Sequence, residues 1–192
     1  KAGEDGEPLD GGTFEIFLAS DTAFEDPLQS IPAEDGVIRF TDLLPGDYVV
    51  REIRAPLGYR IWENDVPVSL AVDPTTNTIS DMEITQPFTD TLLRASIVLS
   101  KTGESARPLS GGLFRIYLAS DTAFENPLQG VAAANGVIRF TNLLPGDYVV
   151  REIRAPFGYR LWESGVPVSL VLDEDTNTLP DVGRSTPPNM CS

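Results

Sequence analysis

The chain has 192 residues, a formal net charge of −15 and no histidine. So acidic a chain disfavours nucleic acid as a partner, because the phosphate backbone carries the same sign of charge. The single cysteine, Cys191, excludes an intrachain disulfide, and the sequence contains neither a zinc cluster nor a D-x-[DN]-x-[DN]-G calcium loop. We therefore expect no metal and no cofactor. No window reaches the ~18 apolar residues that a membrane span requires.

The sequence contains the same small unit twice. A shift of 100 residues aligns Lys1 with Lys101, and the match continues to residue 80 without a gap. We therefore predict two tandem domains, residues 1–90 and 91–192, each large enough for one β-sandwich core. Because the sequence shows neither a signal peptide nor a sorting signal, we expect it to belong to a longer protein.

Each copy opens with a lysine and a polar loop, followed by a strand in which apolar and polar residues alternate, GGTFEIFL in the first copy. Gly11 and Gly12 at its start predict a bend or a bulge. The segment 20–29 is predicted to be an irregular connection with one turn of helix, capped by Ser20 or Asp21.

The turn pair Asp-Gly at 35–36 introduces a predicted strand, VIRF (37–40), and Leu-Leu-Pro-Gly-Asp then turns the chain into a second strand, YVVREI. Proline and glycine in RAPLGYRIWE oppose regular pairing, so Tyr59 and Trp62 are expected to fold over a sheet edge or the end of the core. VPVSLAV is the next predicted strand, and residues 78–85 are predicted to form the last strand of the first copy.

Residues 87–94 form a short link between the copies, and ASIVLS (95–100) is a predicted strand that runs directly into Lys101. This strand is expected to be the first of the second domain, and its counterpart in the first domain is expected to precede Lys1. With about seven short strands per copy and no helical pattern, the sequence predicts an all-β protein of two tandem β-sandwiches.

Strand alternation places charged side chains among apolar ones. In YVVREI, every second residue lies on the same face, so Glu52 shares the face of Tyr48 and Val50. The same alternation directs Glu152 inward in the second copy. Lys101 likewise shares the apolar face of ASIVLS. Two opposite inward charges are consistent with a buried ion pair. Alternatively, a dry core favours the neutral forms, a nucleophilic amine beside a protonated glutamic acid. With Asn or Asp on the adjacent last strand as acceptor, such a lysine could form an isopeptide bond.

These segments resemble the Cna protein B-type (prealbumin-like, SpaA-type) repeats of Gram-positive surface adhesins and pilins, most specifically through GDYVVREIRAPxGY and the upstream lysine. The resemblance implies small β-sandwiches of transthyretin/prealbumin-like (Ig-like) topology. In many family members a lysine on the first strand is bonded to Asn or Asp on the last strand, helped by the glutamate of E-x-x-AP-x-GY. Carried over, these residues are Lys1 and Lys101, with Glu52 and Glu152 as the proton shuttles.

The acceptor departs from the family pattern. The first copy has Gln86 where asparagine is expected, and Asp90 is the nearest alternative. In the second copy Asn189 is the only nearby candidate, and two prolines precede it. The sequence thus predicts Lys1–Asp90 and Lys101–Asn189 as the possible cross-links, with a Glu–Lys ion pair if no bond forms.

The predicted function is structural: stalk or spacer modules of a wall-anchored or secreted extracellular protein, whose partners are its own neighbouring domains. The alternative is a binding module for a host matrix protein or a carbohydrate, with Tyr59 and Trp62 as a stacking platform. That alternative predicts loops that differ between the copies, whereas the loop SDTAFE is the same in both. No nucleophile elbow, phosphate loop or metal cluster supports an enzyme, apart from a single-turnover cross-linking reaction.

Overall fold

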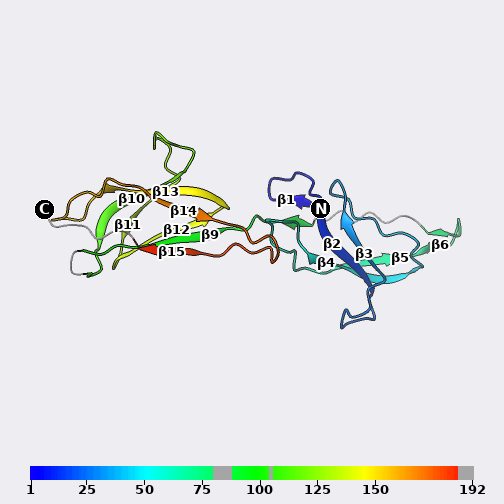
Figure 1. Ribbon diagram of the computed structural model, residues 1–192. Coiled ribbons are helices and arrows are strands. Elements are labelled where there is room, and N and C mark those ends of the chain that lie inside the picture. The colour runs from blue at the N-terminus through cyan, green and yellow to red at the C-terminus, as the bar shows by residue number, and fades with distance from the viewer. Residues whose placement is uncertain (80–87, 104–105, 186–192) are drawn as a thin grey trace. The chain divides into compact units, whose positions relative to one another are not determined.

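The computed structural model describes residues 1–79, 88–103 and 106–185 (Figure 1). It confirms the predicted all-β class, since the described residues form strands and no helix. The chain divides into two compact units, Lys1–Leu92 and Leu93–Ser192, which we describe separately and call the first and the second unit.

The first unit is built on a four-stranded antiparallel sheet of order β3-β2-β4-β5. A short parallel pair, β1 with β8, and a short antiparallel pair, β6 with β7, complete its described strands. The strands are β1 (Ala2–Gly3), β2 (Gly11–Leu18), β3 (Gln29–Ala33), β4 (Gly46–Arg54), β5 (Val66–Leu70), β6 (Val72–Asp73), β7 (Thr78–Ile79) and β8 (Thr89–Asp90).

The second unit has two sheets that share one core. The first, of order β11-β10-β13-β14, is antiparallel and repeats the four-stranded sheet of the first unit, and the second has the order β12-β9-β15. Apolar side chains of β9 and β12 lie in the same buried cluster as those of β10 and β13, which makes the unit a sandwich. The strands are β9 (Ala95–Ser100), β10 (Gly111–Leu118), β11 (Gln129–Ala133), β12 (Val137–Leu143), β13 (Gly146–Arg154), β14 (Val166–Leu170) and β15 (Val182–Ser185).

Alternation along the central strands decides which side chains form the core. Phe14 and Ile16 of β2 are buried, and they lie opposite Glu52 and Val50 of β4. Tyr48, Val50 and Glu52 form the buried row of β4. The pairing of β2 with β3 and with β4 shifts register next to Phe14, where the paired glycines predicted a bend or bulge. The inward row of β4 therefore carries a carboxylate into the core.

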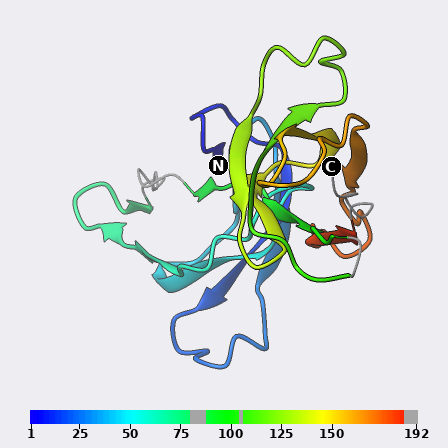
Figure 2. The ribbon, with the colours of Figure 1, turned by 90° about the vertical axis from the view of Figure 1, so that its left-hand side faces the viewer.

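The prediction of a helical turn in segment 20–29 is wrong. Phe24 adopts a positive φ of 55°, which no right-handed helix allows, and the segment forms turns instead. The carboxylate of Asp21 accepts hydrogen bonds from the backbone N–H groups of Phe24, Glu25 and Asp26, at 2.9, 3.1 and 3.0 Å. The aspartate thus organises a loop rather than capping a helix, and in both units this loop projects from the sheet (Figures 1 and 2).

The segment VIRF has a different structure in the two units. In the second unit it belongs to β12, which pairs with β9, whereas residues 38–43 of the first unit are in no strand, contrary to the prediction for 37–40. The sequence is the same, so the difference lies in the pairing partner. Of the strand predicted at 78–85, Thr78–Ile79 is observed as β7, and the remaining residues lie outside those that the structure describes.

Candidate cross-link site

Lys1, Glu52 and Asp90 meet inside the first unit, although they come from three separate segments of the chain. Lys1 directly precedes β1, which pairs in parallel with β8 in the register Gly3 opposite Asp90. The backbone N–H of Ala2 also donates to the carbonyl of Phe88 at 2.8 Å. This pairing brings the lysine beside the aspartate, and alternation along β4 directs Glu52 toward both.

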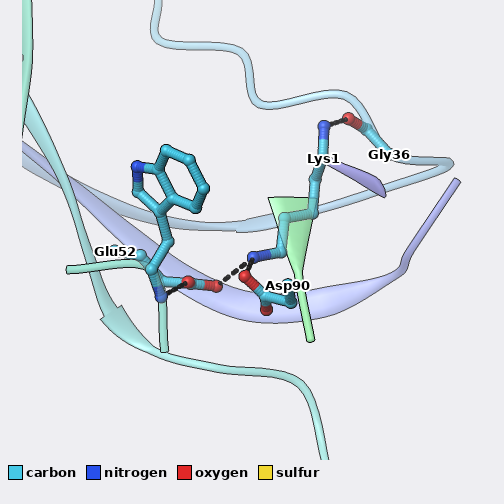
Figure 3. Close-up of polar contacts among 5 residues, drawn as sticks. Lys1, Gly36, Glu52 and Asp90 are labelled. Carbon is cyan, nitrogen blue, oxygen red and sulfur yellow. Dashed lines mark hydrogen bonds and ion pairs between the residues drawn. The ribbon is translucent and has the colours of Figure 1, made fainter. Parts of the chain in front are cut away.

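The lysine amine lies between two carboxylates (Figure 3). Lys1 Nζ donates a hydrogen bond to Glu52 Oε1 at 2.7 Å and forms a close ion pair with Asp90 Oδ1. The side chains of all three residues are 0% exposed. Neither oxygen of Asp90 accepts a conventional hydrogen bond from the described residues, so the amine is the neighbour that the aspartate faces. Charged groups at such depth are rare unless they are paired.

Glu52 is held by a second donor on its other oxygen. The backbone N–H of Trp62 donates to Glu52 Oε2 at 2.7 Å. Burial raises the pKa of Glu52, the hydrogen bonds from Lys1 and Trp62 oppose this shift, and the negative charge of Asp90 adds to it. The net direction is upward, so the site favours a proton on this carboxyl group more than water does.

Gly12 makes room for the carboxylate. A Cβ at this position would lie 3.0 Å from Glu52 Oε1 and 3.0 Å from the carbonyl oxygen of Arg54. The backbone of Gly12 also has a φ of +71°, which favours glycine. The sequence predicted a bend here but not that the missing side chain leaves space for the buried acid.

The second unit repeats the lysine–glutamate pair. Lys101 Nζ lies 3.3 Å from Glu152 Oε1, both side chains are 0% exposed, and the backbone N–H of Trp162 donates to Glu152 Oε2 at 2.9 Å. Burial lowers the pKa of Lys101, and the nearby charge of Glu152 opposes this shift. The net shift is downward, so the site favours the neutral, nucleophilic amine more than water does.

The predicted acceptor of the second unit, Asn189, lies outside the described residues, as does Gln86 of the first copy. The last described strand, β15, runs parallel to β9 and reaches Ser185, which pairs with Ser100. The structure therefore brings together lysine, glutamate and acceptor in the first unit and describes lysine and glutamate in the second.

Trp62 and Tyr59 make packing and backbone contacts within the first unit. Trp62 packs against the core, with its ring in an edge contact to Phe88 at a centroid distance of 6.4 Å. Tyr59 is half-buried and forms an isolated β-bridge with Leu92. The sequence predicted this packing role, but it did not predict that the backbone of Trp62 orients Glu52.

Each folded unit is thus a small β domain with a buried lysine–glutamate pair. The family model described as SpaA, prealbumin-like fold domain, matches residues 1–85 and 95–181. The chain belongs to this family, in two tandem copies, and the family resemblance seen in the sequence is confirmed.

Three solved bacterial structures are similar to this chain. The Bacillus anthracis TIE protein superposes with a TM-score of 0.66 at 19% identity, over 99% of this chain and 32% of that one. A streptococcal ancillary pilin matches with a TM-score of 0.42 at 20% identity, over 100% of this chain and 60% of that one. The Streptococcus agalactiae minor pilin GBS52 has a TM-score of 0.42 and 17% identity, over 97% and 85%.

This chain thus spans less than two thirds of the first two proteins, and at these identities the likeness concerns the fold alone. A search of curated proteins gave no match. Over residues 1–79, 88–103 and 106–185, no helix is long and apolar enough to cross a membrane. The same residues contain no group of three His, Cys, Asp or Glu side chains arranged to hold a metal ion.

Proposed function

We propose that the chain is a structural stalk segment of an extracellular bacterial surface protein, wall-anchored or secreted, in which an isopeptide bond stabilises the first unit. The observation that carries this proposal is the contact of Lys1 Nζ with both Glu52 and Asp90 in a fully buried site. Membership in the SpaA prealbumin-like family and the serial arrangement of two β units support the stalk role. The partners are the neighbouring domains of the same protein.

The proposed reaction joins an amine to a carboxylic acid. The nitrogen of Lys1 forms a bond to Cγ of Asp90, and the bond from Cγ to one carboxyl oxygen breaks. Glu52 accepts a proton from the nitrogen and delivers a proton to the departing oxygen, which leaves as water. One amine and one carboxylic acid thus give one amide and one water, without an outside reactant.

Three features of the site favour this reaction over a stable ion pair. The amine already contacts the acceptor carboxyl, so that little approach is needed. Burial raises the pKa of Glu52, which favours the protonated acid that can deliver a proton to the departing oxygen. The N–H of Trp62 holds one oxygen of Glu52 and leaves the other directed at the amine, the position that a proton shuttle requires.

The second unit holds the same lysine and glutamate, and we propose Asn189 as its acceptor on the basis of sequence alone. Attack on an asparagine side chain would release ammonia instead of water. The two bonds therefore lower the mass of the chain by different amounts: Lys1–Asp90 by one water and Lys101–Asn189 by one ammonia.

The test is the intact mass of the denatured chain. The proposal predicts a deficit of one water from the first unit, which disappears in Glu52→Gln and is retained in the matched surface variant Glu63→Gln. Glu63 is exposed, so its loss changes charge without touching the site. An unmodified mass in the parent chain, with folding verified by circular dichroism, contradicts the cross-link. A deficit that persists in Glu52→Gln contradicts the assigned role of Glu52.

A further inference from the structure

The outer face of the four-stranded sheet carries different charges in the two units. One row of positions crosses each sheet on the side that faces away from the core. In the first unit this row consists of Ser30, Glu15, Arg51 and Asp65. In the second unit the same positions, which we call the arginine row, hold Gly130, Arg115, Arg151 and Gly165. The second unit thus has two arginines where the first has one arginine and two acids.

In the first unit the arginine has carboxylates on both sides. Arg51 of β4 lies directly opposite Glu15 of β2 in the antiparallel pairing of these strands. Its Nε also donates a hydrogen bond to Asp65 Oδ1 at 2.6 Å, and both of these side chains are half-exposed. This ion pair shows that the outer face accepts a carboxylate against the arginine.

In the second unit the corresponding arginine has lost both acids. Arg115 of β10 lies directly opposite Arg151 of β13, so two positive side chains leave neighbouring strands on the same face. Like charges placed directly opposite each other in a sheet destabilise it. Gly165 stands where the first unit has its aspartate, and in the described part of the chain no carboxylate forms an ion pair with either arginine. The two charges therefore remain available to an outside anion.

The neighbouring residues hold the arginines in place without covering them. The guanidinium of Arg151 lies 4.4 Å from the ring centre of Phe124, in the loop that folds over this face. A Cβ on Gly130 would lie 3.6 Å from Arg115 Cγ, and one on Gly165 would lie 3.7 Å from Arg151 Cγ. Because glycine has no side chain, both ends of the row stay open, and both arginines are partly exposed.

We infer that the arginine row is a binding site for an acidic polypeptide segment of a separate protein. The two arginines start from neighbouring strands about 4.8 Å apart, and alternate residues of an extended segment are about 6.7 Å apart, a difference that the long arginine side chains can span. The ligand is accordingly an extended segment with Asp or Glu at every second position. Each carboxylate then forms a charge-assisted pair with one guanidinium, as Asp65 does with Arg51 in the first unit.

The charge of the rest of the chain determines where such a ligand binds. Residues 1–100 contain 6 Lys or Arg and 19 Asp or Glu, a net charge of −13, whereas residues 101–192 contain 8 and 10, a net charge of −2. An acidic segment is therefore repelled by the first unit and less so by the second. A sulfated polysaccharide carries a long series of negative charges and would match a longer basic track, whereas this row has glycine on both sides of its two arginines.

The test adds a capped peptide, GSESESESG, to the full chain at low ionic strength and follows the arginine Nε–H signals by NMR. We expect the signals of Arg115 and Arg151 to shift, with half-saturation at roughly 1 mM peptide or below. The signal of Arg51 is the internal control and is expected to stay in place, because Asp65 already occupies it. The matched peptide GSQSQSQSG is expected to cause no shift, and added salt is expected to weaken binding of the acidic peptide.

Two charge-matched variants test whether the row itself is the site. Arg115→Glu introduces the residue that the first unit has at this position, and we expect it to weaken binding roughly tenfold or more. Arg139→Glu makes the same change of charge at an exposed residue of β12 and is expected to retain binding. In the first unit, Glu15→Arg combined with Asp65→Gly recreates the arginine row and is expected to make the Arg51 signal respond to the peptide.

Four results would each overturn the proposal. They are no shift of either signal up to roughly 10 mM peptide, equal loss of binding in Arg115→Glu and Arg139→Glu, and no response of Arg51 in the double variant of the first unit. The fourth is tighter binding of heparin than of the peptide to the same two arginines, which would assign the row to a sulfated polysaccharide. Unchanged backbone amide signals away from the substituted residues verify that each variant is folded.

Discussion

Gly12→Ala tests whether the space beside Glu52 matters for the cross-link site. The new Cβ would lie 3.0 Å from Glu52 Oε1 and from the carbonyl oxygen of Arg54, closer than side chains normally approach. The residue would also adopt a φ of +71°, which costs an alanine about 1–2 kcal/mol. Crowding adds about 1–3 kcal/mol, as for other over-packed sites. We therefore expect the first unit to lose about 2–5 kcal/mol in its free energy of unfolding.

Gly11→Ala is the matched control, because Gly11 has a similar φ of +79° but a Cβ at this position would meet no other atom within 4 Å. Gly11→Ala should therefore lower the free energy of unfolding only by the cost of the positive φ, about 1–2 kcal/mol. Urea unfolding in a Trp162→Phe background makes Trp62 the single tryptophan, so that its fluorescence reports on the first unit. Intact mass then shows whether the water deficit is retained in the control and lost or delayed in Gly12→Ala. Equal destabilisation and equal cross-linking in the two variants would show that the space beside Glu52 does not matter.

Three further substitutions test the surrounding interactions. Glu152→Gln removes the carboxylate beside the buried Lys101 and is expected to cost about 3–5 kcal/mol. Burial lowers the pKa of Lys101 in the fold, so the folded variant binds fewer protons than the unfolded chain. The free energy of unfolding of this variant therefore rises as the pH increases toward about 10.4, the ordinary pKa of lysine. A free energy of unfolding that does not change with pH contradicts this. Asp21→Ala removes three loop hydrogen bonds and is expected to cost about 1–2 kcal/mol, measured by urea unfolding. Arg51→Ala removes a guanidinium 4.1 Å from the ring of Phe24 and should cost only about 0.5–1 kcal/mol, since the group is half-exposed; a loss above that of Asp21→Ala would contradict it.

Much of the fold follows from alternation in the sequence. The strand at 95–100 has the predicted bounds, and its inward row leads directly to Lys101, which is 0% exposed. The same rule places Glu52 in the core. These predictions hold because a strand that is buried on one face must alternate, so a charge in the apolar row can only point inward.

Other features depend on contacts that the local sequence does not contain. The segment VIRF forms a strand only where β9 is beside it, so pairing with a distant segment decides its structure. The loop after β2 forms no helical turn, because Phe24 has a positive φ and the carboxylate of Asp21 binds the loop amides. The N–H of Trp62 binds Glu52, and no side-chain pattern reveals a backbone donor.

Proteolysis of the denatured chain, followed by mass spectrometry of the fragments, tests directly for the bond between Lys1 and Asp90. We expect one branched peptide in which the side chain of Lys1 is joined to the side chain of Asp90, lighter by one water than its two linear parts. In Asp90→Ala the branch disappears and Lys1 is recovered in a linear peptide. Recovery of separate linear peptides carrying Lys1 and Asp90 from the unaltered chain would show that the isopeptide bond does not form.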